Sequence, residues 1–575
     1  MVATTFEDST VGTRPRPGSA GAIQTTVWVA TFVLVVLPVL PLLYASLLSL
    51  PLYLPGGQLT LDGYTQLLAD PLFWTAVKNT LGFAAIATTL AVSGGALFAI
   101  LCTRTNLPGR RVFSLLILLP ITLPPLGLLL GWVAIYGDYG YITVFLQHAH
   151  VPVWSLSSVV GMGILGGCLA LPIAFLTCRA SLQQSDTRLE AAARSAGATS
   201  LTVIRRVTLP LLRPALVNSA VLVAILALEN VGIGLIVGVY NHVDLYGSFL
   251  YHTWAHSPDP DPTTVSAGAI LLLVAVGCLL VGRRVVLRRG QRFVGLAAGE
   301  PGATPIDLGR GGLPFALLIT AFLTFTVVIP ILALLVTANV SVFSPLIPPW
   351  QVGTLNNWAT LTNTGRLTDS IQHSLLIAAF GGLITTLGVA IATLVAHRSR
   401  FRLRATEGAM LLLPRSIPGI AIGLGVFWTY LLLNPPGGFL RNSIWGVGLA
   451  LCVRSVTLPY LIILPSLSRI GTELDAAARS VGASWWRIST RIVLPQLRPA
   501  LLAAFILMFV TLLNDYDPAL FLVTPDSQIM GVTILQTYVR GLSGPVAALA
   551  LVQVGITAVA LGAGVFAFGR IRARH

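Results

Sequence analysis

The sequence predicts an all-α polytopic membrane protein with about 12 transmembrane helices in two six-helix repeats. Hydrophobic residues make up 55% of the 575 residues and charged residues only 10%, whereas soluble domains carry about 25% charged residues. Twelve apolar runs are long enough to cross the roughly 30 Å hydrocarbon core of a bilayer. One basic segment occurs twice, between apolar runs in each half of the chain. This composition excludes the soluble protein classes, despite a formal net charge of +15 that would otherwise suggest nucleic acid as a partner.

The apolar runs define the expected spans. Those of the first half lie at about 23–50, 74–101, 113–136, 154–178, 215–239 and 263–282. Those of the second half lie at about 313–340, 370–396, 407–432, 443–465, 501–523 and 544–568. Because backbone polar groups in lipid must be satisfied within the segment, each run is expected to be a helix.

Arginine residues set the expected orientation. They cluster before the first run, after every second run and at the end of the chain, whereas the opposite loops carry only Arg366, Arg441 and Arg540. The positive-inside rule then predicts a multi-pass membrane protein with an even number of spans and both termini in the cytoplasm. The first run is too long for the core of a signal peptide and is expected to stay as a membrane anchor.

Internal similarity divides the chain into two units of the same orientation. Leu118–Trp132 resembles Leu412–Trp428, both beginning with Leu-Leu-Pro. Parallel repeats are related by a pseudo-twofold axis along the membrane normal, which places a pathway between them. The expected divisions are a cytoplasmic tail at 1–22, a first six-span repeat at 23–282, a cytoplasmic linker at 283–312, a second repeat at 313–568 and a cytoplasmic tail at 569–575.

The duplicated basic segment is the clearest motif. Glu190–Leu216 and Asp475–Leu501 align without gaps and are identical at 15 of 27 positions. Each copy reads as a helix, a glycine break and a second short helix. In the first copy Glu190 and Arg194, four residues apart, can form an ion pair, and Gly197 permits the turn. Pro210 is expected to end the second helix. Such a short helix between two fixed segments can move as a rigid body.

These residues resemble the membrane subunits of binding-protein-dependent ABC importers of the type I fold. The family signature is Glu-Ala-Ala, three residues, Gly, nine residues, Ile-x-Leu-Pro, and the Gly-to-Leu-Pro spacing matches in both halves. The resemblance implies that each loop is a coupling helix that docks on an ATPase subunit. The coupling residues implied are Glu190, Arg194, Gly197, Arg205, Arg206, Pro210, Asp475, Arg479, Gly482, Arg487, Arg491 and Pro495. The alternative is a pair of ordinary basic connectors.

The sequence departs from the signature at its acid. The family's glutamate would fall at Ala191 and Ala476, whereas the acids here, Glu190 and Asp475, come one residue earlier. One residue is a rotation of roughly 100° around a helix. The partner of each acid is therefore left open by the resemblance.

The resemblance covers most of the chain and is greatest to fused two-repeat permeases of the ferric-iron type, through Pro414–Gly419, Leu228–Gly232 and Thr524–Leu535. It implies two ABC ATPase subunits and an extracytoplasmic solute-binding protein as partners. The only lysine is Lys78, preceded by Ala76-Val77, so no phosphate-binding G-x-x-x-x-G-K-[ST] loop is possible. We therefore expect no enzymatic site and no bound cofactor on this chain. ATP and Mg²⁺ are expected on its partner subunits, and nucleic acid is not expected as a partner.

Polar residues within two of the runs, about 20 Å from the cytoplasmic loops and past the midplane of the membrane, mark a candidate pathway. Glu229-Asn230 in the first half corresponds to Asn514-Asp515 in the second, and Asp517 follows. A charge within the bilayer costs about 2.5–3.5 kcal/mol on insertion scales, so such residues tend to face a cavity or a partner. The acids are expected to line or gate the outer pathway and to favour a cation. The alternative is hydrogen bonding between helices and local structure at helix ends.

Two arginines and one loop complete the candidates. Arg415 is expected to snorkel to the cytoplasmic surface, and Arg454 to pair with an acid or a carbonyl. The outer loop His242–Pro262 holds histidines and aspartates whose spacing matches no closed ligand set, so a docking surface for the binding protein is preferred over a metal site. The five cysteines form no C-x-x-C pair and are expected to be core residues.

The function expected from these features is the permease subunit of an ATP-driven ABC importer, for ferric iron or another small solute. Thiamine, phosphonate, polyamine and oxyanion permeases of the same kind remain alternatives. The rival from another class is a secondary transporter driven by an ion gradient, which also has twelve spans in two repeats. In that case Glu229 and Asp515 would carry protons or ions.

Overall fold

The computed structural model describes residues 19–255, 261–290, 306–433, 436–471 and 473–572. Within these residues the chain is helical, and the only β-structure consists of three isolated bridges. Two of the bridges occupy matched places, since Leu48 pairs with Leu59 and Val340 with Gly353 in the outer loop after the first span of each half. The internal repeat is therefore visible in the connections as well as in the helices.

The helices of the first half follow the predicted runs. They are α1 Ser19–Val35, α2 Val39–Ala45, α3 Asp62–Ala69, α4 Pro71–Arg104, α5 Arg110–Leu116, α6 Leu119–Thr122, α7 Pro125–Tyr136, α8 Tyr141–His148, α9 Val159–Gln184, α10 Arg188–Ser195, α11 Ser200–Val203, η1 Ile204–Thr208, α12 Leu209–Leu228, α13 Gly232–Val237, η2 Gly238–Asn241, α14 Tyr246–Ala255 and α15 Pro262–Gly290.

The second half repeats this order with more interruptions. Its helices are η4 Gly309–Gly311, α16 Gly312–Leu323, η5 Thr324–Val328, α17 Ile329–Ala338, η6 Pro349–Gln351, α18 Asn356–Asn363, α19 Gly365–Leu376, η7 Ile377–Gly381, α20 Gly382–Arg398, α21 Arg404–Leu412, η8 Leu413–Ser416, α22 Gly419–Leu432, α23 Pro436–Arg441, α24 Ile444–Ser455, α25 Thr457–Ser468, α26 Glu473–Ser480, α27 Trp485–Ile488, η9 Ser489–Val493, α28 Leu494–Gln496, α29 Arg498–Asn514, η10 Pro518–Phe521, η11 Pro525–Ser527, α30 Met530–Val539 and α31 Ser543–Arg572.

The predicted number of spans is confirmed as an upper count. Among the described residues, nine helical stretches are long and apolar enough to cross a membrane, and the count is twelve when three bent pairs are each taken as one span. The bends are 111° between Arg404–Ser416 and Gly419–Leu432, 46° within 444–468, and 75° between Trp485–Gln496 and Arg498–Asn514. All three bent spans belong to the second half.

The third span differs from its predicted range of 113–136. The chain there is divided into α5, α6 and α7, and the stretch that qualifies as a span is Pro125–His148. Pro120, Pro124 and Pro125 lack backbone N–H groups, so one continuous helix cannot form across them. The matched segment of the second half breaks at the same place, before Gly419.

The proline of each duplicated loop does not end its helix, as the sequence suggested. After Gly197, α11 runs into the π-turn η1 and directly into α12, with Pro210 in the first turn of α12. A wider π-turn accommodates the missing N–H, and proline is tolerated in a first helical turn. The second loop likewise continues through η9 into α28, and the chain bends only at Leu497. Each loop therefore leads directly into the span that follows it, as one helical stretch in the first half and through a 75° bend at Leu497 in the second.

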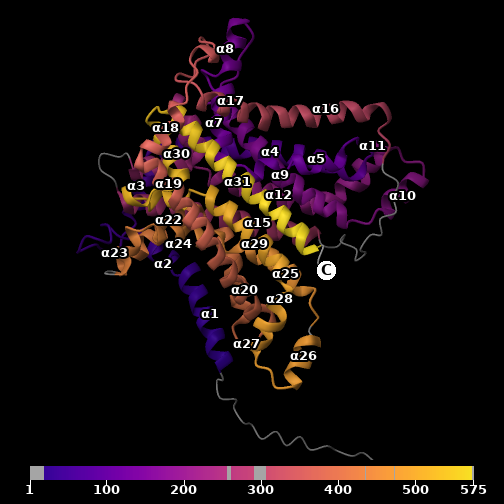
Figure 1. Cartoon of the computed structure of the whole chain (residues 1–575), viewed down its shortest axis with the longest axis vertical. Helices are drawn as coiled ribbons and strands as arrows, with labels where there is room; N and C mark the ends of the chain where they lie inside the picture. The colour runs from indigo at the N-terminus through magenta and orange to yellow at the C-terminus, as the bar shows by residue number, and fades with distance from the viewer. Residues whose placement is uncertain (1–18, 256–260, 291–305, 434–435, 472, 573–575) are drawn as a thin grey trace, which may run out of the picture.

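The first span of each half packs against the other half. Figure 1 shows indigo α1 beside orange helices of the second half, and α16 along the purple helices of the first half. Thr31 of α1 donates to Glu407 at 2.8 Å, and the ring of Phe322 in α16 lies 5.3 Å from that of Phe98. The predicted divisions at 282 and 313 therefore separate the repeats in sequence, but they are not boundaries of packing.

Matched glycines permit this exchange. Gly131 in α7 lies against the backbone of Pro330 in α17, where an added Cβ would be 2.6 Å from the Pro330 carbonyl carbon. Gly425 in α22 lies against Pro38 at the break between α1 and α2, where a Cβ would be 3.0 Å from the carbonyl carbon. Each glycine stands eleven residues after the proline of the Leu-Leu-Pro in its repeat, Pro120 or Pro414. The same close approach thus occurs twice, once from each half to the other.

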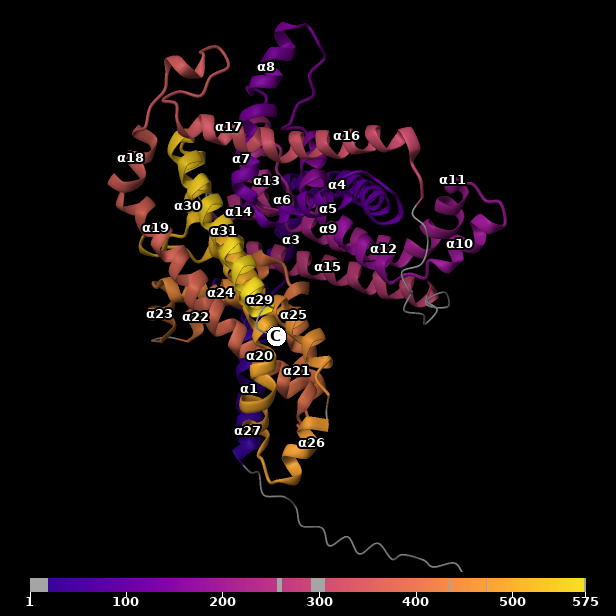
Figure 2. The same cartoon turned by 45° about the vertical axis from the view of Figure 1, so that its right-hand side comes forward.

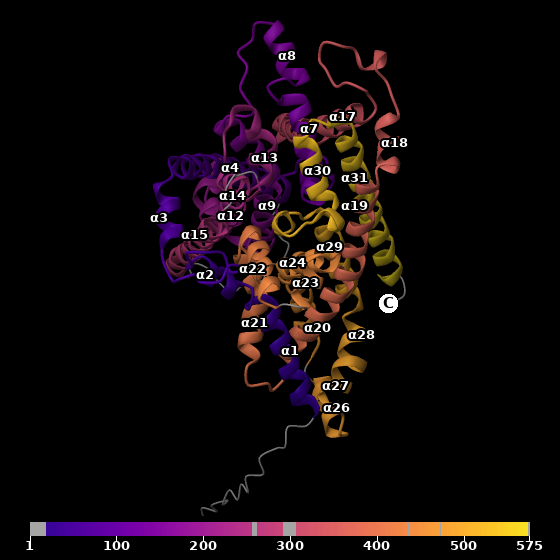
Figure 3. The same ribbon diagram turned by 90° about the vertical axis from the view of Figure 1, so that its left-hand side faces the viewer.

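The molecule has two arms that meet in a shared core. Figures 1 and 2 show α4, α9, α12 and α15 in one arm and α20, α25 and α29 in the other, with the two duplicated loops at the far ends. Figure 3 shows α8 at one end of the molecule and α26 and α27 at the opposite end. The largest buried apolar cluster contains residues of both halves, including Trp132 and Trp428, and a smaller cluster lies within each arm.

Candidate coupling loops and transport pathway

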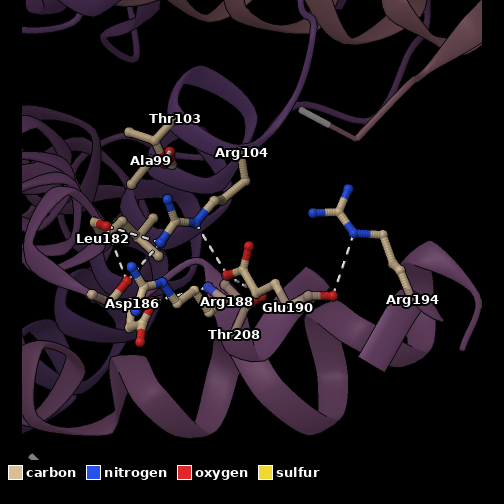
Figure 4. A network of polar contacts seen from close by, with 10 residues as sticks. Ala99, Thr103, Arg104, Leu182, Asp186, Arg188, Glu190, Arg194 and Thr208 are labelled. Atoms are coloured by element: carbon tan, nitrogen blue, oxygen red, sulfur yellow. Dashed lines mark hydrogen bonds and ion pairs between the residues drawn. The ribbon is translucent and has the colours of Figure 1, made fainter. Parts of the chain in front are cut away.

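The acid of the first loop is a buried anchor. Figure 4 shows Glu190 of α10 turned toward Arg104, the last residue of α4. Arg104 donates from Nε to Glu190 Oε1 at 3.1 Å, and the Thr208 hydroxyl donates to the same oxygen at 3.0 Å. Glu190 is only 2% exposed. The contact therefore joins the loop, the start of α12 and the end of the second span at Arg104.

Arg104 also contacts the end of α9, the span that precedes the first loop. Its Nη2 donates to the Leu182 carbonyl at 2.9 Å and to the Ser185 hydroxyl at 2.6 Å. Arg194, the expected ion-pair partner of Glu190, donates from Nε to the Glu190 backbone carbonyl at 3.3 Å. The carboxylate of Glu190 is thus directed into the protein, and the guanidinium of Arg104 makes the contacts that join the loop to the ends of α4 and α9 (Figure 4).

The second loop has the same anchor. Arg398, the last residue of α20, donates from Nη1 to Asp475 Oδ2 at 3.0 Å and from Nη2 to the carbonyls of Leu467 and Ile470. Asp475 is 3% exposed. The Trp485 indole then donates to the Arg398 carbonyl at 3.1 Å. Arg104 and Arg398 were visible in the sequence only as charges after a span, and the signal that could have identified them is that each ends the second span of its repeat.

The outward-facing residues of the loops are different ones. Arg205 and Arg206 are exposed in the first loop, with Leu201 beside them in α11. Arg479, Arg487 and Arg491 are exposed in the second, with Val481 and Trp486. Exposed apolar and arginine side chains together are typical of the residues that proteins use at interfaces. The structure therefore assigns Glu190 and Asp475 to holding the loops, and leaves the arginines available for a partner.

The loop glycines are required by backbone conformation. Gly197 has a φ of +84° and Gly482 a φ of +81°, and an added Cβ would meet no atom within 4 Å at either position. L-residues other than asparagine and aspartate pay about 1–2 kcal/mol in this left-handed region. We expect Gly197→Val with Gly482→Val to leave a folded protein with impaired ATP-driven import, and Gly197→Asn with Gly482→Asn to stay near wild type. Uptake by reconstituted vesicles checks both, and equal uptake by the valine pair would contradict a role for this turn.

The candidate pathway residues meet at the ends of α12 and α29. Glu229 and Asp515 are the residues that follow these helices, rather than positions inside the spans as predicted. Arg454 of α24 lies between them, as expected for a buried arginine that pairs with acids. Its Nη1 is 3.0 Å from Asp515 Oδ1 and 2.8 Å from Asp517 Oδ2, and its Nη2 is 3.4 Å from Glu229 Oε2.

The two amides of the candidate set have other roles. Asn230 Oδ1 accepts from the Ile233 amide at 2.9 Å and so caps the start of α13. Asn514 is 8% exposed, and its Oδ1 has no hydrogen-bond partner within the described part of the chain. Arg415, expected to snorkel to the cytoplasmic surface, lies in the 3₁₀-turn before the break at Gly419 with an exposed side chain, and it interacts electrostatically with Glu229 and Asp515. The structure therefore joins three of the five pathway candidates directly.

The outer loop contributes a cavity rather than a ligand cluster. The described residues contain no group of three or more His, Cys, Asp or Glu side chains placed to hold a metal ion, and His256 and Asp259 lie outside the described residues. Asp244 and His252 form an ion pair of 3.2 Å. Burial raises the pKa of Asp244, but the hydrogen bond and charge of His252 lower it more, so its net pKa is below the ordinary value. Both line an outer cavity of about 670 Å³ that also includes Gln536 and Arg540 of the second half.

Comparison with known proteins connects both sites to transport. Residues 91–292 and 384–572, together more than half the chain, match the family described as binding-protein-dependent transport system inner membrane component. A ferric transport system permease protein of Haemophilus influenzae is 24% identical over 484 residues, which cover 81% of this chain and 72% of that protein. A spermidine/putrescine transport system permease protein of Escherichia coli is 28% identical over 214 residues, 36% of this chain and 78% of that protein.

A solved structure is also similar in part. A chain of a bacterial ABC transporter involved in the import of the acidic polysaccharide alginate aligns with 46% of this chain and 97% of its own length, at 18% sequence identity and a TM-score of 0.37. At that TM-score the alignment supports no conclusion about how the two halves are arranged. The family match includes both duplicated loops and both helices that end at the Arg454 cluster.

Proposed function

Because the chain belongs to the family of binding-protein-dependent transport system inner membrane components, we propose that this one polypeptide forms the complete membrane pathway of an ABC importer. The two halves supply the two sides of the pathway, and the shared buried core joins them. The observation that carries the proposal is the pair of duplicated loops, each anchored by a buried arginine–acid pair and each continuous with a span that ends at the Arg454 cluster.

Two separate ATPase subunits drive the cycle, one at each loop. The exposed side chains of Arg205 and Arg206 in one loop, and of Arg487 and Arg491 in the other, support this assignment. ATP and Mg²⁺ bind to the partners, since the sequence leaves no place for a phosphate-binding loop around Lys78. The chain itself binds no cofactor and has no enzymatic site. The partners' closure would move the anchored loops, and with them α12 and α29.

The loops face the cytoplasm of a bacterium, and both termini lie on that side of the plasma membrane. The clustering of arginine in every second loop supports this orientation. A solute-binding protein docks on the opposite side, over the cavity lined by Asp244, His252 and Arg540. Because both halves line this cavity, a bound protein there would contact both sides of the pathway at once.

Ferric iron delivered by the binding protein is the proposed substrate. The Haemophilus influenzae relative with a ferric name matches over 81% of the chain, in the same fused form. The three acids Glu229, Asp515 and Asp517 outnumber the two arginines beside them, Arg454 and Arg415, which suits a cation. A polyamine is the second candidate, because a spermidine/putrescine permease matches over 36% of the chain, and polyamines are also cations.

The test of the proposed function is reconstitution. The tagged protein should co-purify with an ATPase encoded beside it, and vesicles containing the complex should import substrate only with ATP and the binding protein. A secondary transporter would instead work alone, driven by an ion gradient. Uptake by the isolated chain under an ion gradient, with no ATPase retained, would overturn the proposal.

The substrate is tested separately on the binding protein. Calorimetric titration with ferric iron, spermidine, thiamine and a phosphonate should give its tightest binding with ferric iron, and vesicles loaded with ATP should accumulate radioactive iron. If spermidine binds most tightly, the second candidate replaces the first and the importer assignment stands. If a phosphonate or another anion binds most tightly, the argument from the pathway acids fails.

A further inference from the structure

The two helices that leave the duplicated loops end at one arginine. Helix α12 ends at Leu228 and presents Glu229, and α29 ends at Asn514 and presents Asp515. Arg454 contacts both acids from α24. Glu229 is 6% exposed, and the guanidinium of Arg454 is 14% exposed. Any movement of the loops that α12 and α29 transmit therefore reaches a buried ionic contact between the halves.

The contacts of Arg454 are of two kinds. Those within the second half are short, at 3.0 Å to Asp515 and 2.8 Å to Asp517, and the Asp517 amide also donates to Asp515 Oδ1 at 3.3 Å. The contact to the first half is longer, at 3.4 Å to Glu229. The other polar contact of the Glu229 carboxylate also crosses between the halves, from the Gly419 amide at 3.2 Å. The second-half contacts form a unit, to which Glu229 is attached by longer bonds.

The scaffold itself does not require this contact. Leu169 stands as far beyond the helix-capping Ser158 as Arg454 stands beyond the matched Ser443, so the first half has an apolar residue at the equivalent place. Pro125, which has no N–H, matches Gly419, and Asn514 matches Glu229. Each of the three groups that make the contact between the halves is replaced, in the other copy of the repeat, by a group that cannot make it. One copy of the repeat thus folds without the charges, which points to a task other than folding.

The glycine at position 419 is what admits the arginine. A Cβ there would be 2.7 Å from the Arg454 guanidinium carbon and 2.8 Å from the Asp517 Cβ. The break before Gly419, where the span bends by 111°, also directs its amide toward Glu229. The bend before Gly419 and the ion cluster around Arg454 therefore depend on each other, and the contact between the halves lies where they meet.

We propose that Glu229 is a reversible tie that holds the pathway closed, and that Arg454 releases Glu229 while keeping Asp515 and Asp517 when the loops move. The inference rests on the proposed function, because it takes the loops to be driven by partner ATPases. The first half is held in the closed state by the bonds that join the Glu229 carboxylate to Arg454 and Gly419. These bonds exist only while α12 and α24 stay together. Opening the pathway breaks these two bonds and leaves the second-half unit intact.

The test uses the complete complex with its ATPases in lipid nanodiscs and in vesicles. Glu229→Gln keeps the size of the side chain and removes the charge, and Glu229→Asp keeps the charge and shortens the reach. Both should raise ATP hydrolysis without the binding protein by about tenfold, the factor expected when one hydrogen bond to a charged group no longer holds the closed state. Both should also make vesicles leak preloaded substrate. Leu169→Met, a change of similar volume at the place in the first half that matches Arg454, should change neither quantity.

The outcomes separate the tie from a simple role in folding. If Glu229 only neutralises Arg454, Glu229→Asp behaves as wild type, and the proposal is overturned. Wild-type basal hydrolysis and tightness in Glu229→Gln overturn it as well. If Glu229→Gln fails to give monodisperse complex, Glu229→Asp and Arg454→Lys decide by the same two measurements. A wild-type complex that retains no ATPase contradicts the proposed function itself, which is seen before any variant is compared.

Discussion

Replacing Arg398 by methionine is expected to abolish ATP-driven import while leaving the two halves of the membrane core assembled. Asp475 would remain 3% exposed without its guanidinium partner. Removing one member of a buried ion pair costs about 3–5 kcal/mol, because the other charge stays buried and uncompensated. That cost falls on the second loop, which Arg398 joins to the ends of α20 and α25 through Asp475 and two backbone carbonyls. We expect import to fall at least about tenfold.

The matched control lies on the same acid. Arg479 also approaches Asp475, at 3.9 Å, but its side chain is 45% exposed. Exposed ion pairs contribute about 0–1 kcal/mol, so Arg479→Met should leave the anchor intact. The thermal unfolding midpoint of the purified complex compares the two variants side by side, and vesicle uptake measures import by Arg398→Met. The first loop predicts the same contrast in stability between Arg104→Met and Arg194→Met, because Arg194 corresponds to Arg479 in the repeat. Import by Arg398→Met within twofold of wild type would show that the anchor does not position the loop.

Leucine at Gly131 and Gly425 is expected to prevent the exchange of first spans between the halves. Each glycine lies against the backbone of a proline in the opposite half, and a Cβ alone would be 2.6 Å from the Pro330 carbonyl carbon or 3.0 Å from that of Pro38. A backbone cannot move aside as a side chain can, so the helices must separate. Overpacking of a core costs about 1–3 kcal/mol or more, and we expect the larger end of that range for each variant.

Glycines in open space provide the comparison. Gly277 in α15 and Gly388 in α20 have no atom within 4 Å of an added Cβ. Alanine there should be neutral or should stabilise the helix by about 0.5–1 kcal/mol. Size-exclusion profiles and thermal unfolding in detergent distinguish the two pairs of positions. Equal stability of Gly131→Leu and Gly277→Ala would mean that the first spans do not pack as the structure places them.

The candidate site was only partly predictable from the sequence. Repetition located both loops, and the matched acids led to Glu229 and Asp515. The sequence did not identify the partners of those acids. Arg104 and Glu190 are 86 residues apart, and Arg454 and Glu229 are 225 apart, so nothing in local spacing could pair them. The prediction that Leu-Pro would end each loop helix was wrong, because the π-turns η1 and η9 carry the helix past Pro210 and Pro495.

The sequence by itself determined the class, the number of spans and the repeat. The hydrophobicity and length that define a span are properties of one segment and do not depend on its neighbours. A duplicated pattern is likewise visible in the residues, whatever positions its two copies take in the fold. Only the tertiary structure decided that the first spans exchange between halves, that Glu190 and Asp475 face inward, and that one arginine joins the ends of α12 and α29. These features depend on which helices lie side by side. The sequence alone does not decide this, because one apolar helix surface can pack against many other apolar helices. Close contacts at Gly131 and Gly425, and the few buried charges, select one arrangement among them.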